Sequence, residues 1–366
     1  VIFDANTPGT SKVSGMQTEI VATFDQSIKD SALIEPTAIG YTFVGYSTEK
    51  TYSVQTRVTA SSKNLVAVPA DDGSSSVTVY ATWTANTDTV YSVEHYRESL
   101  TGEYVKFETE PLSGTTDTTV TAAAKTYDGF THTSGGVETG NIKADGTTVL
   151  TVRYSRNSYT VSFDPAKGSK TGDMTSTAGG EAVTGETFER TVKFEDKIGE
   201  LPDVSIKGYD FDGWYLGETK VIPTTTLDTV GNKTIVARFT ARTDTAYEIE
   251  HYFEELDGSF KLFSKVPHKG TTDTTATTVT LDEAGFTFDA ENANNVVGLA
   301  INGNGTTLLK LYYLRDTDVK YSVEYYLQNV DDDLFTINTK ATETLSGKTG
   351  ATVSAEIKTF VGFTRR

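Results

Sequence analysis

The sequence contains no cysteine, so neither a disulfide nor a thiolate metal site can stabilise it. It has no run of 18 apolar residues, so we expect no membrane insertion within this segment. Basic residues are scarce, because 32 Lys and Arg face 50 Asp and Glu, which gives a formal charge of −18. Clustered Lys and Arg bind nucleic acid and anionic lipid, so neither is expected as a partner.

What the chain does contain is repetition. Residues 91–96 (YSVEHY) return as 247–252 (YEIEHY) and again as 321–326 (YSVEYY). The first two copies lie 156 residues apart, as the positions of His95 and His251 show (251 − 95 = 156). A unit repeated at fixed spacing is typical of an array of modules, whose function is reach, multivalency or both.

Two types of module alternate within this period. Type A opens with a Val-x-Phe-Asp strand and has a Gly-aromatic segment in its middle, and type B opens with the YSVEHY strand. The predicted order is A1 (1–86), B1 (87–156), A2 (157–241), B2 (242–316) and B3 (317–366). B3 is predicted to be incomplete, because the closing strand of the other B copies has no counterpart in it.

The local patterns favour β-strands with little helix. In the closing strand of B1, Leu150, Val152 and Tyr154 fall on one face, and Thr, Tyr and Phe are abundant along the chain. Residues 120–125 and 196–201 are each predicted to form a short helix. These patterns predict a β-rich α+β fold of small modules, each with one short crossover element.

Two resemblances to bacterial surface repeats rest on these motifs. In type A, residues 80–83 (YATW) and 211–215 (FDGWY) resemble the Listeria–Bacteroides repeat, also known as the internalin B-repeat. In type B, residues 91–96, 102–104 (GEY) and 144–150 are similar to mucin-binding-protein-type repeats of Gram-positive adhesins. The resemblances imply β-grasp (ubiquitin-like) modules that form an extended, monomeric rod.

The sequence gives no sign of an enzyme. It has no cysteine nucleophile and no Gly-x-Ser-x-Gly elbow, and none of the four histidines lies in a cluster of acids. His95 and His251 occupy equivalent positions, where B3 has Tyr325, so we interpret them as structural strand residues. We therefore predict no catalytic residue, no cofactor and no metal site.

Candidate ligand-binding residues come from two repeated features of type B. Aromatic side chains on the polar face of the opening strand could stack on sugars or contact a protein. The polar segments 114–119 and 270–275 (GTTDTT) could bind sugars or an extended peptide, or could be soluble loops. The predicted ligand-binding residues are Tyr96, Tyr252, Tyr326, Thr115, Thr116, Thr271 and Thr272.

These features predict a segment of a bacterial adhesin that is attached to the cell wall or secreted, and whose B modules bind a host mucosal glycoprotein. Mucin and immunoglobulin are both compatible partners. The alternative is a passive stalk that projects a distal domain from the cell wall. The first residues form no charged-then-apolar signal and the last residues show no anchoring pattern, so we expect both ends to be cuts in a longer protein.

Overall fold

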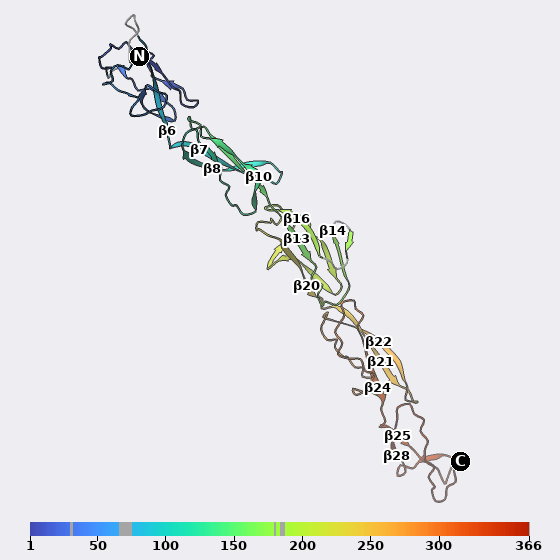
Figure 1. The fold of residues 1–366 in the computed structure, drawn as a ribbon. Coiled ribbons are helices and arrows are strands. Elements are labelled where there is room, and N and C mark those ends of the chain that lie inside the picture. The colour runs from blue at the N-terminus through green and yellow to red at the C-terminus, as the bar shows by residue number, and fades with distance from the viewer. Residues whose placement is uncertain (30–31, 66–74, 179–180, 184–186, 366) are drawn as a thin grey trace. The chain divides into compact units, whose positions relative to one another are not determined.

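The chain is all-β. The computed structural model describes residues 1–29, 32–65, 75–178, 181–183 and 187–365, and within them it contains β-strands and no α-helix (Figure 1). The prediction of a β-rich α+β array of β-grasp modules is therefore wrong. No helix among the described residues has the length and apolar character needed to cross a membrane.

Both predicted helices are replaced by other structure for local reasons. Residues 120–125 begin in β9 (Thr119–Thr121), which pairs with β11 (Thr139–Asn141), because β-branched Thr and Val favour a strand. Residues 196–201 are irregular apart from an isolated bridge of Lys197 to Thr226, since Glu195 directly before them and Gly199 within them have φ angles of 62° and 82°, which an α-helix does not allow. Segments this short are too short to stabilise a helix by themselves.

The described chain forms two compact units. The first comprises Val1–Thr160, Thr191–Lys197 and Thr226–Gly231, and the second comprises Val161–Arg190, Ile198–Thr225 and Asn232–Arg366. The division into five modules stays a prediction, and we keep A1, B1, A2, B2 and B3 as names of residue ranges.

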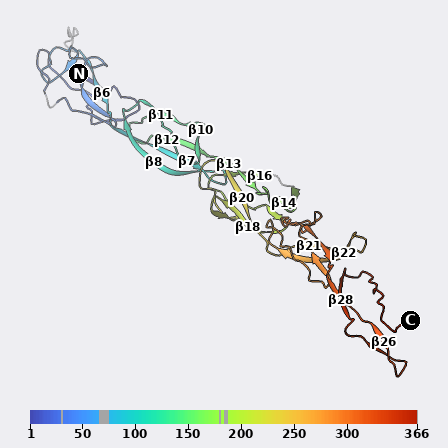
Figure 2. The ribbon, with the colours of Figure 1, turned by 90° about the horizontal axis from the view of Figure 1, so that it is seen from below.

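Two main sheets build A1 and B1. The A1 sheet has the order β1 (Ile2–Asp4), β6 (Thr78–Ala85), β4 (Tyr41–Ser47), β3 (Thr37–Ala38), β2 (Val13–Ser14), with β5 (Arg57–Val58) on β4. The B1 sheet has the order β10 (Phe130–Val137), β12 (Val149–Arg156), β7 (Thr89–Glu98), β8 (Tyr104–Gly114) (Figure 2). In both sheets the opening and closing strands are parallel neighbours, which places the start and the end of each range at opposite ends of its sheet.

The A2 range forms two sheets. The larger has the order β16 (Phe188–Lys193), β13 (Ser158–Asp164), β20 (Lys233–Ala241), β18 (Tyr209–Leu216), β19 (Thr219–Val221). The smaller has the order β15 (Glu181–Val183), β14 (Met174–Ala178), β17 (Asp203–Ile206). Trp214 is 1% exposed and its indole N–H donates to the carbonyl of Pro202 at 2.8 Å, which satisfies the one polar group of this core side chain.

The B2 sheet repeats that of B1. Its order is β22 (Phe260–Gly270), β21 (Thr245–Glu254), β24 (Leu308–Arg315), β23 (Phe286–Phe288), and β21 and β24 are parallel (Figure 1). Alternate residues of β24, Leu309, Leu311 and Tyr313, are fully buried, as the alternation predicts. B3 contains two strand pairs, β25 (Val319–Val323) with β28 (Glu343–Gly347) and β26 (Tyr326–Gln328) with β27 (Phe335–Ile337).

Candidate binding surface and segment junctions

The hydroxyl of each of the three predicted tyrosines bonds the acid two residues before it. The hydroxyl of Tyr96 donates to Glu94 Oε2 at 2.6 Å, and that of Tyr252 donates to Glu250 Oε2 at 2.7 Å. Tyr326 is 54% exposed and makes the same bond to Glu324 at 2.8 Å. Residues two apart on a strand share a face, so the Glu-x-Tyr spacing itself creates the pair in β7 and β21, whereas Glu324 lies between β25 and β26.

Cations complete this face in B1 and B2. Lys106 Nζ lies 2.9 Å from Glu94 Oε1, and the bonds from Tyr96 and Lys106 lower the pKa of the Glu94 carboxyl. In B2, the bond to Glu250 raises the pKa of Tyr252 to about 12, while its ring stacks on Tyr312 with the centroids 4.8 Å apart. An aromatic ring with an ionised acid and an amine beside it can stack on a sugar or contact a polar protein surface.

The four predicted threonines lie where the A and B ranges meet. Thr116 and Thr272 are each only 2% exposed. Both are therefore buried, although the segments that contain them are polar. Thr116 Oγ1 donates to the carbonyl of Gly40 at 2.9 Å, and Thr272 Oγ1 donates to that of Gly208 at 2.7 Å. Their neighbours Thr115 and Thr271 are half-buried. A ligand-binding role for these threonines stays a prediction.

The strand histidines are part of the core. His95 is fully buried, with Nδ1 3.0 Å from the Tyr154 hydroxyl, and that hydroxyl accepts the backbone N–H of Lys125 at 2.8 Å. Tyr313 makes the equivalent bonds to His251 and to the Leu281 N–H, at 2.9 and 2.8 Å. Burial lowers the pKa of His251, as does nearby His268. Among the described residues no three or more His, Asp and Glu side chains are placed to hold a metal ion.

The recurring arrangement that stands out is a backbone motif at four junctions. In each, a glycine carbonyl accepts the N–H of a linking residue, and the carbonyl of that residue accepts the N–H of a receiving residue; all eight bonds measure 2.8–2.9 Å. We call this the junction motif. Its glycine, linking and receiving residues are Gly40–Asn86–Thr116, Gly129–Asn157–Phe194, Gly208–Arg242–Thr272 and Gly285–Asp316–Thr349.

Each junction glycine precedes an aromatic residue and must be glycine. The φ angles of Gly40, Gly129, Gly208 and Gly285 are 76°, 76°, 80° and 84°, in the left-handed region. A Cβ on Gly129 would lie 2.0 Å from the Phe194 ring, and one on Gly285 would lie 2.7 Å from Thr349. At Gly129 and Gly285 the left-handed turn thus lets the receiving residue pack directly on the glycine, and at Gly40 it makes room for Ala144 of B1.

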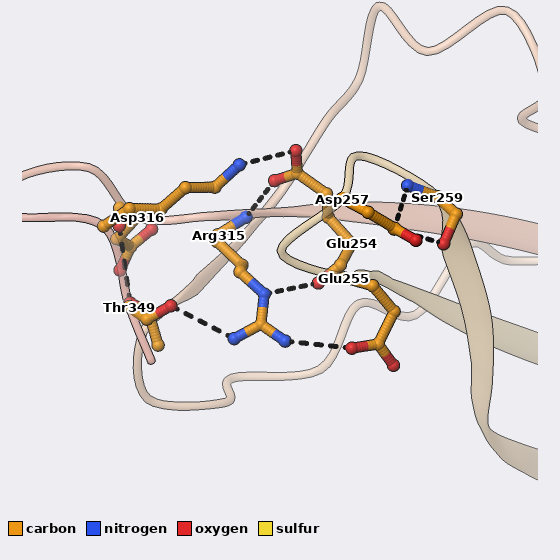
Figure 3. Close-up of polar contacts among 8 residues, drawn as sticks. Glu254, Glu255, Asp257, Ser259, Arg315, Asp316 and Thr349 are labelled. Carbon is orange, nitrogen blue, oxygen red and sulfur yellow. Dashed lines mark hydrogen bonds and ion pairs between the residues drawn. The ribbon is translucent and has the colours of Figure 1, made fainter. Parts of the chain in front are cut away.

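At the Gly285 junction, Arg315 connects the two ranges (Figure 3). Its Nε donates to the Glu254 carbonyl at 2.6 Å and its Nη1 to the Thr349 carbonyl at 3.1 Å. The Glu254 carboxylate accepts the Arg315 backbone N–H at 3.0 Å and pairs with Lys348 Nζ at 2.7 Å. The Lys348 bond is the main cause that lowers the pKa of Glu254.

The Gly129 junction has the same side-chain set, although the range after it is of type A instead of type B. Arg156 Nη1 donates to the Phe194 carbonyl at 2.7 Å and also reaches Glu195 at 2.6 Å. The carboxylate of Glu98 accepts the Arg156 backbone N–H at 2.9 Å and pairs with Lys193 at 3.1 Å. These two bonds lower the pKa of Glu98, with the backbone bond contributing most.

Sequence reasoning missed these junction residues. The signal available to it was the Gly-aromatic pair, which occurs at the junction glycines Gly40, Gly129, Gly208 and Gly285 and also at Gly45, Gly213 and Gly362. Each B sheet also closes on an Arg directly before the linking residue, Arg156 in B1 and Arg315 in B2.

Comparisons with known proteins identify part of the chain. Residues 159–238 match the Listeria-Bacteroides repeat domain, a repeat of bacterial surface or secreted proteins, so this part of the predicted resemblance is confirmed. The internalin type and the resemblance of the B ranges to mucin-binding repeats stay predictions. A search of curated proteins gives no match.

The solved structures that match include that of the Bacillus anthracis TIE protein. It shares 10% sequence identity and a TM-score of 0.29 over 66% of this chain and 52% of its own. The chain thus spans about half the length of that structure. A similarity this low carries no argument about fold or function.

Proposed function

We propose that the chain is a non-enzymatic spacer within a repeat array of a bacterial surface or secreted protein. The observation that carries this proposal is the junction motif, which joins consecutive ranges by the same two backbone bonds at four places. A single linking residue bonded on both sides leaves little freedom between the ranges it joins. A repeated junction of this kind adds length with each module, which suits a spacer.

Distance measurements between spin labels test the spacer. The chain has no native cysteine, so cysteines at the exposed positions Thr51 in A1 and Thr101 in B1 give one labelled pair. We expect a narrow distribution of distances between the labels. Gly40→Ala should broaden it, because a Cβ there would lie 2.7 Å from the Ala144 side chain.

Gly15→Ala is the matched control. Gly15 also has a positive φ, of 78°, but no atom lies within 4 Å of a Cβ built on it. The control should therefore keep the narrow distribution. A broad distribution in the unmodified chain would contradict the spacer proposal.

The Tyr–Glu pairs favour a second function, binding of a host mucosal glycoprotein such as mucin or immunoglobulin. Tyr96, Tyr252 and Tyr326 present the same pair of groups on three B ranges, and weak single sites gain apparent affinity when they are linked. In this proposal the B ranges bind and the A ranges separate them, so binding and spacing are compatible.

A pull-down from mucosal secretion tests this second function. The immobilised chain should enrich mucin or immunoglobulin, and replacing Tyr96, Tyr252 and Tyr326 together by Ser should abolish the enrichment. Tyr104→Ser is the control, because this exposed tyrosine bonds Thr133 and not an acid. An eluate without glycoprotein would eliminate the binding proposal and leave the spacer untouched.

A further inference from the structure

Two turns of the A ranges, which we call tips, share a positive φ angle and the same closing bond. Asp25 and Glu195 have φ angles of 60° and 62°, and each follows a phenylalanine, Phe24 in A1 and Phe194 in A2. A backbone bond closes each turn: Gln26 N–H donates to the Thr23 carbonyl and Asp196 N–H to that of Lys193, both at 3.0 Å. Phe24 is therefore the structural counterpart of Phe194.

The surroundings of the two phenylalanines differ. Phe194 is 7% exposed, and its ring packs edge-on against Phe130 with the centroids 5.9 Å apart. Phe24 is 51% exposed, and Val21 beside it is fully exposed. The Phe194 N–H donates to Asn157, whereas within the described residues the Phe24 N–H has no backbone acceptor. The A1 tip thus presents the Phe24 ring and the Phe24 N–H without the aromatic neighbour and the backbone acceptor that Phe194 has.

The Gly129 junction shows what fits such a tip. Its surface consists of a left-handed Gly-aromatic turn, a linking carbonyl and an arginine that reaches both the receiving carbonyl and the acid after it. Asp25 stands where Glu195 meets Arg156, so the A1 tip keeps the acid. Thr23 replaces Lys193, so A1 lacks the partner of Glu98 and would dock without that ion pair.

We infer that the A1 tip around Phe24 is a docking surface for the exit end of a B-type module, formed by its Gly-aromatic turn and closing arginine. The inference rests on the proposed spacer function, because it extends the junction motif to a tip that is exposed in this structure. The Gly285 junction supports it: the same exit end receives Thr349 of a B range, so the exit end is not specific for one module type.

The test lengthens the chain by a second copy of residues 87–160 placed directly before Val1. Val161 of A2 is the counterpart of Val1. The added copy therefore places its Gly129 as many residues before Val1 as Gly129 lies before Val161. We expect amide exchange at Phe24 to slow by about tenfold or more, because its N–H gains a buried acceptor. Gly129→Ala in the added copy should restore fast exchange, since the Cβ would occupy the position of the docked ring.

Gly102→Ala in the added copy is the control, because Gly102 has a φ of 91° and open space around a Cβ. Fast exchange at Phe24 in the lengthened chain would overturn the inference, as would an added copy that does not fold in front of A1. Phe194 serves as the internal reference. If its amide is protected while that of Phe24 is not, the spacer proposal stands and only the inference fails.

Discussion

The junctions at Gly40 and Gly208 differ in chemistry from those at Gly129 and Gly285, although all four have the same backbone bonds. Where an A range ends, hydroxyl groups contact the motif: Thr116 bonds Thr89, and Tyr41 bonds Asp117. The ion pairs at the Gly208 junction, from Arg242 to Asp210 and Asp244, lie on the surface. Where a B range ends, arginine, glutamate and lysine surround the same motif.

This difference shows that the backbone geometry and the side-chain chemistry of a junction are separable. The left-handed glycine and the two amide bonds set the path of the backbone through the junction. They require only a left-handed turn and the space that a residue without a Cβ leaves. The side chains can then be hydroxyls or ions, provided that the buried groups find partners. Substitutions should therefore be severe at the glycine and milder at the surrounding side chains.

The largest expected effect comes from Gly129→Ala or Gly285→Ala. A left-handed alanine costs about 1–3 kcal/mol, and overpacking against Phe194 or Thr349 adds about 1–3 kcal/mol. Faster amide exchange at the receiving residues, Phe194 and Thr349, would measure this loss of stability. Gly362→Ala is the matched control, since this Gly has a φ of 90° and open space, and it should show only the first of these costs.

Arg315→Gln should have the next largest effect. Arg315 is mostly buried and donates to the Glu254 carbonyl within B2 and to the Thr349 carbonyl across the Gly285 junction, so its loss should cost about 1–3 kcal/mol locally. Exchange at the Thr349 amide would measure it. Arg242→Gln at the Gly208 junction is the comparison, because Arg242 is more exposed and pairs with surface acids. Equal losses at both sites would contradict the difference between the junction types.

A smaller effect is expected for Thr116→Val. The substitution removes the hydroxyl bonds to Gly40 and Thr89, but the Gly40 carbonyl keeps the Asn86 N–H at 2.9 Å. The expected cost is about 1 kcal/mol, with the backbone motif intact. Protection of the Thr116 amide should fall modestly; a complete loss would show that the hydroxyl, and not the backbone, holds this junction.

The smallest effects are those of pH, and they have opposite directions. The pKa values of Glu98 and Glu254 are lowered, so the contribution of these carboxylates to the stability of their junctions is present above pH 4.5 and is lost as the pH falls. Burial and the bond to Asp117 raise the pKa of Tyr41 to about 12. Its contribution is therefore present below pH 10 and is lost as the pH rises through about 12.

Amide exchange at fixed temperature across this pH range, corrected for intrinsic rates, would separate the two junction types. Acid should release Phe194 and Thr349 before Thr116, and alkali should release Thr116 first. Release of all three together at either end would mean that the side chains do not distinguish the junctions.

The strands and their buried faces could be predicted from the sequence, because alternation reports directly on burial. Leu150, Val152 and Tyr154 are at most 4% exposed, and so are Val93 and His95 in the opening strand. The predicted helices failed because apolar content in a short segment does not distinguish a helix from a strand followed by a turn.

The junctions could not be predicted, because their members are far apart in sequence. Glu98 and Arg156 are 58 residues apart and meet only through the parallel pairing of β7 and β12. The burial of Thr116 likewise depends on an acceptor 76 residues away, at Gly40. The repeated Gly-aromatic pair was visible, but its left-handed conformation and its docking role depend on the fold.

The most direct test of the junction motif is residue-resolved amide exchange of the unmodified chain at neutral pH. The account predicts that the amides of Thr116, Phe194, Thr272 and Thr349 exchange slowly, at rates near those of the sheet cores, while Phe24 exchanges as fast as an exposed loop. If those four amides exchange as fast as Phe24, the ranges are joined loosely and the proposed spacer mechanism is wrong.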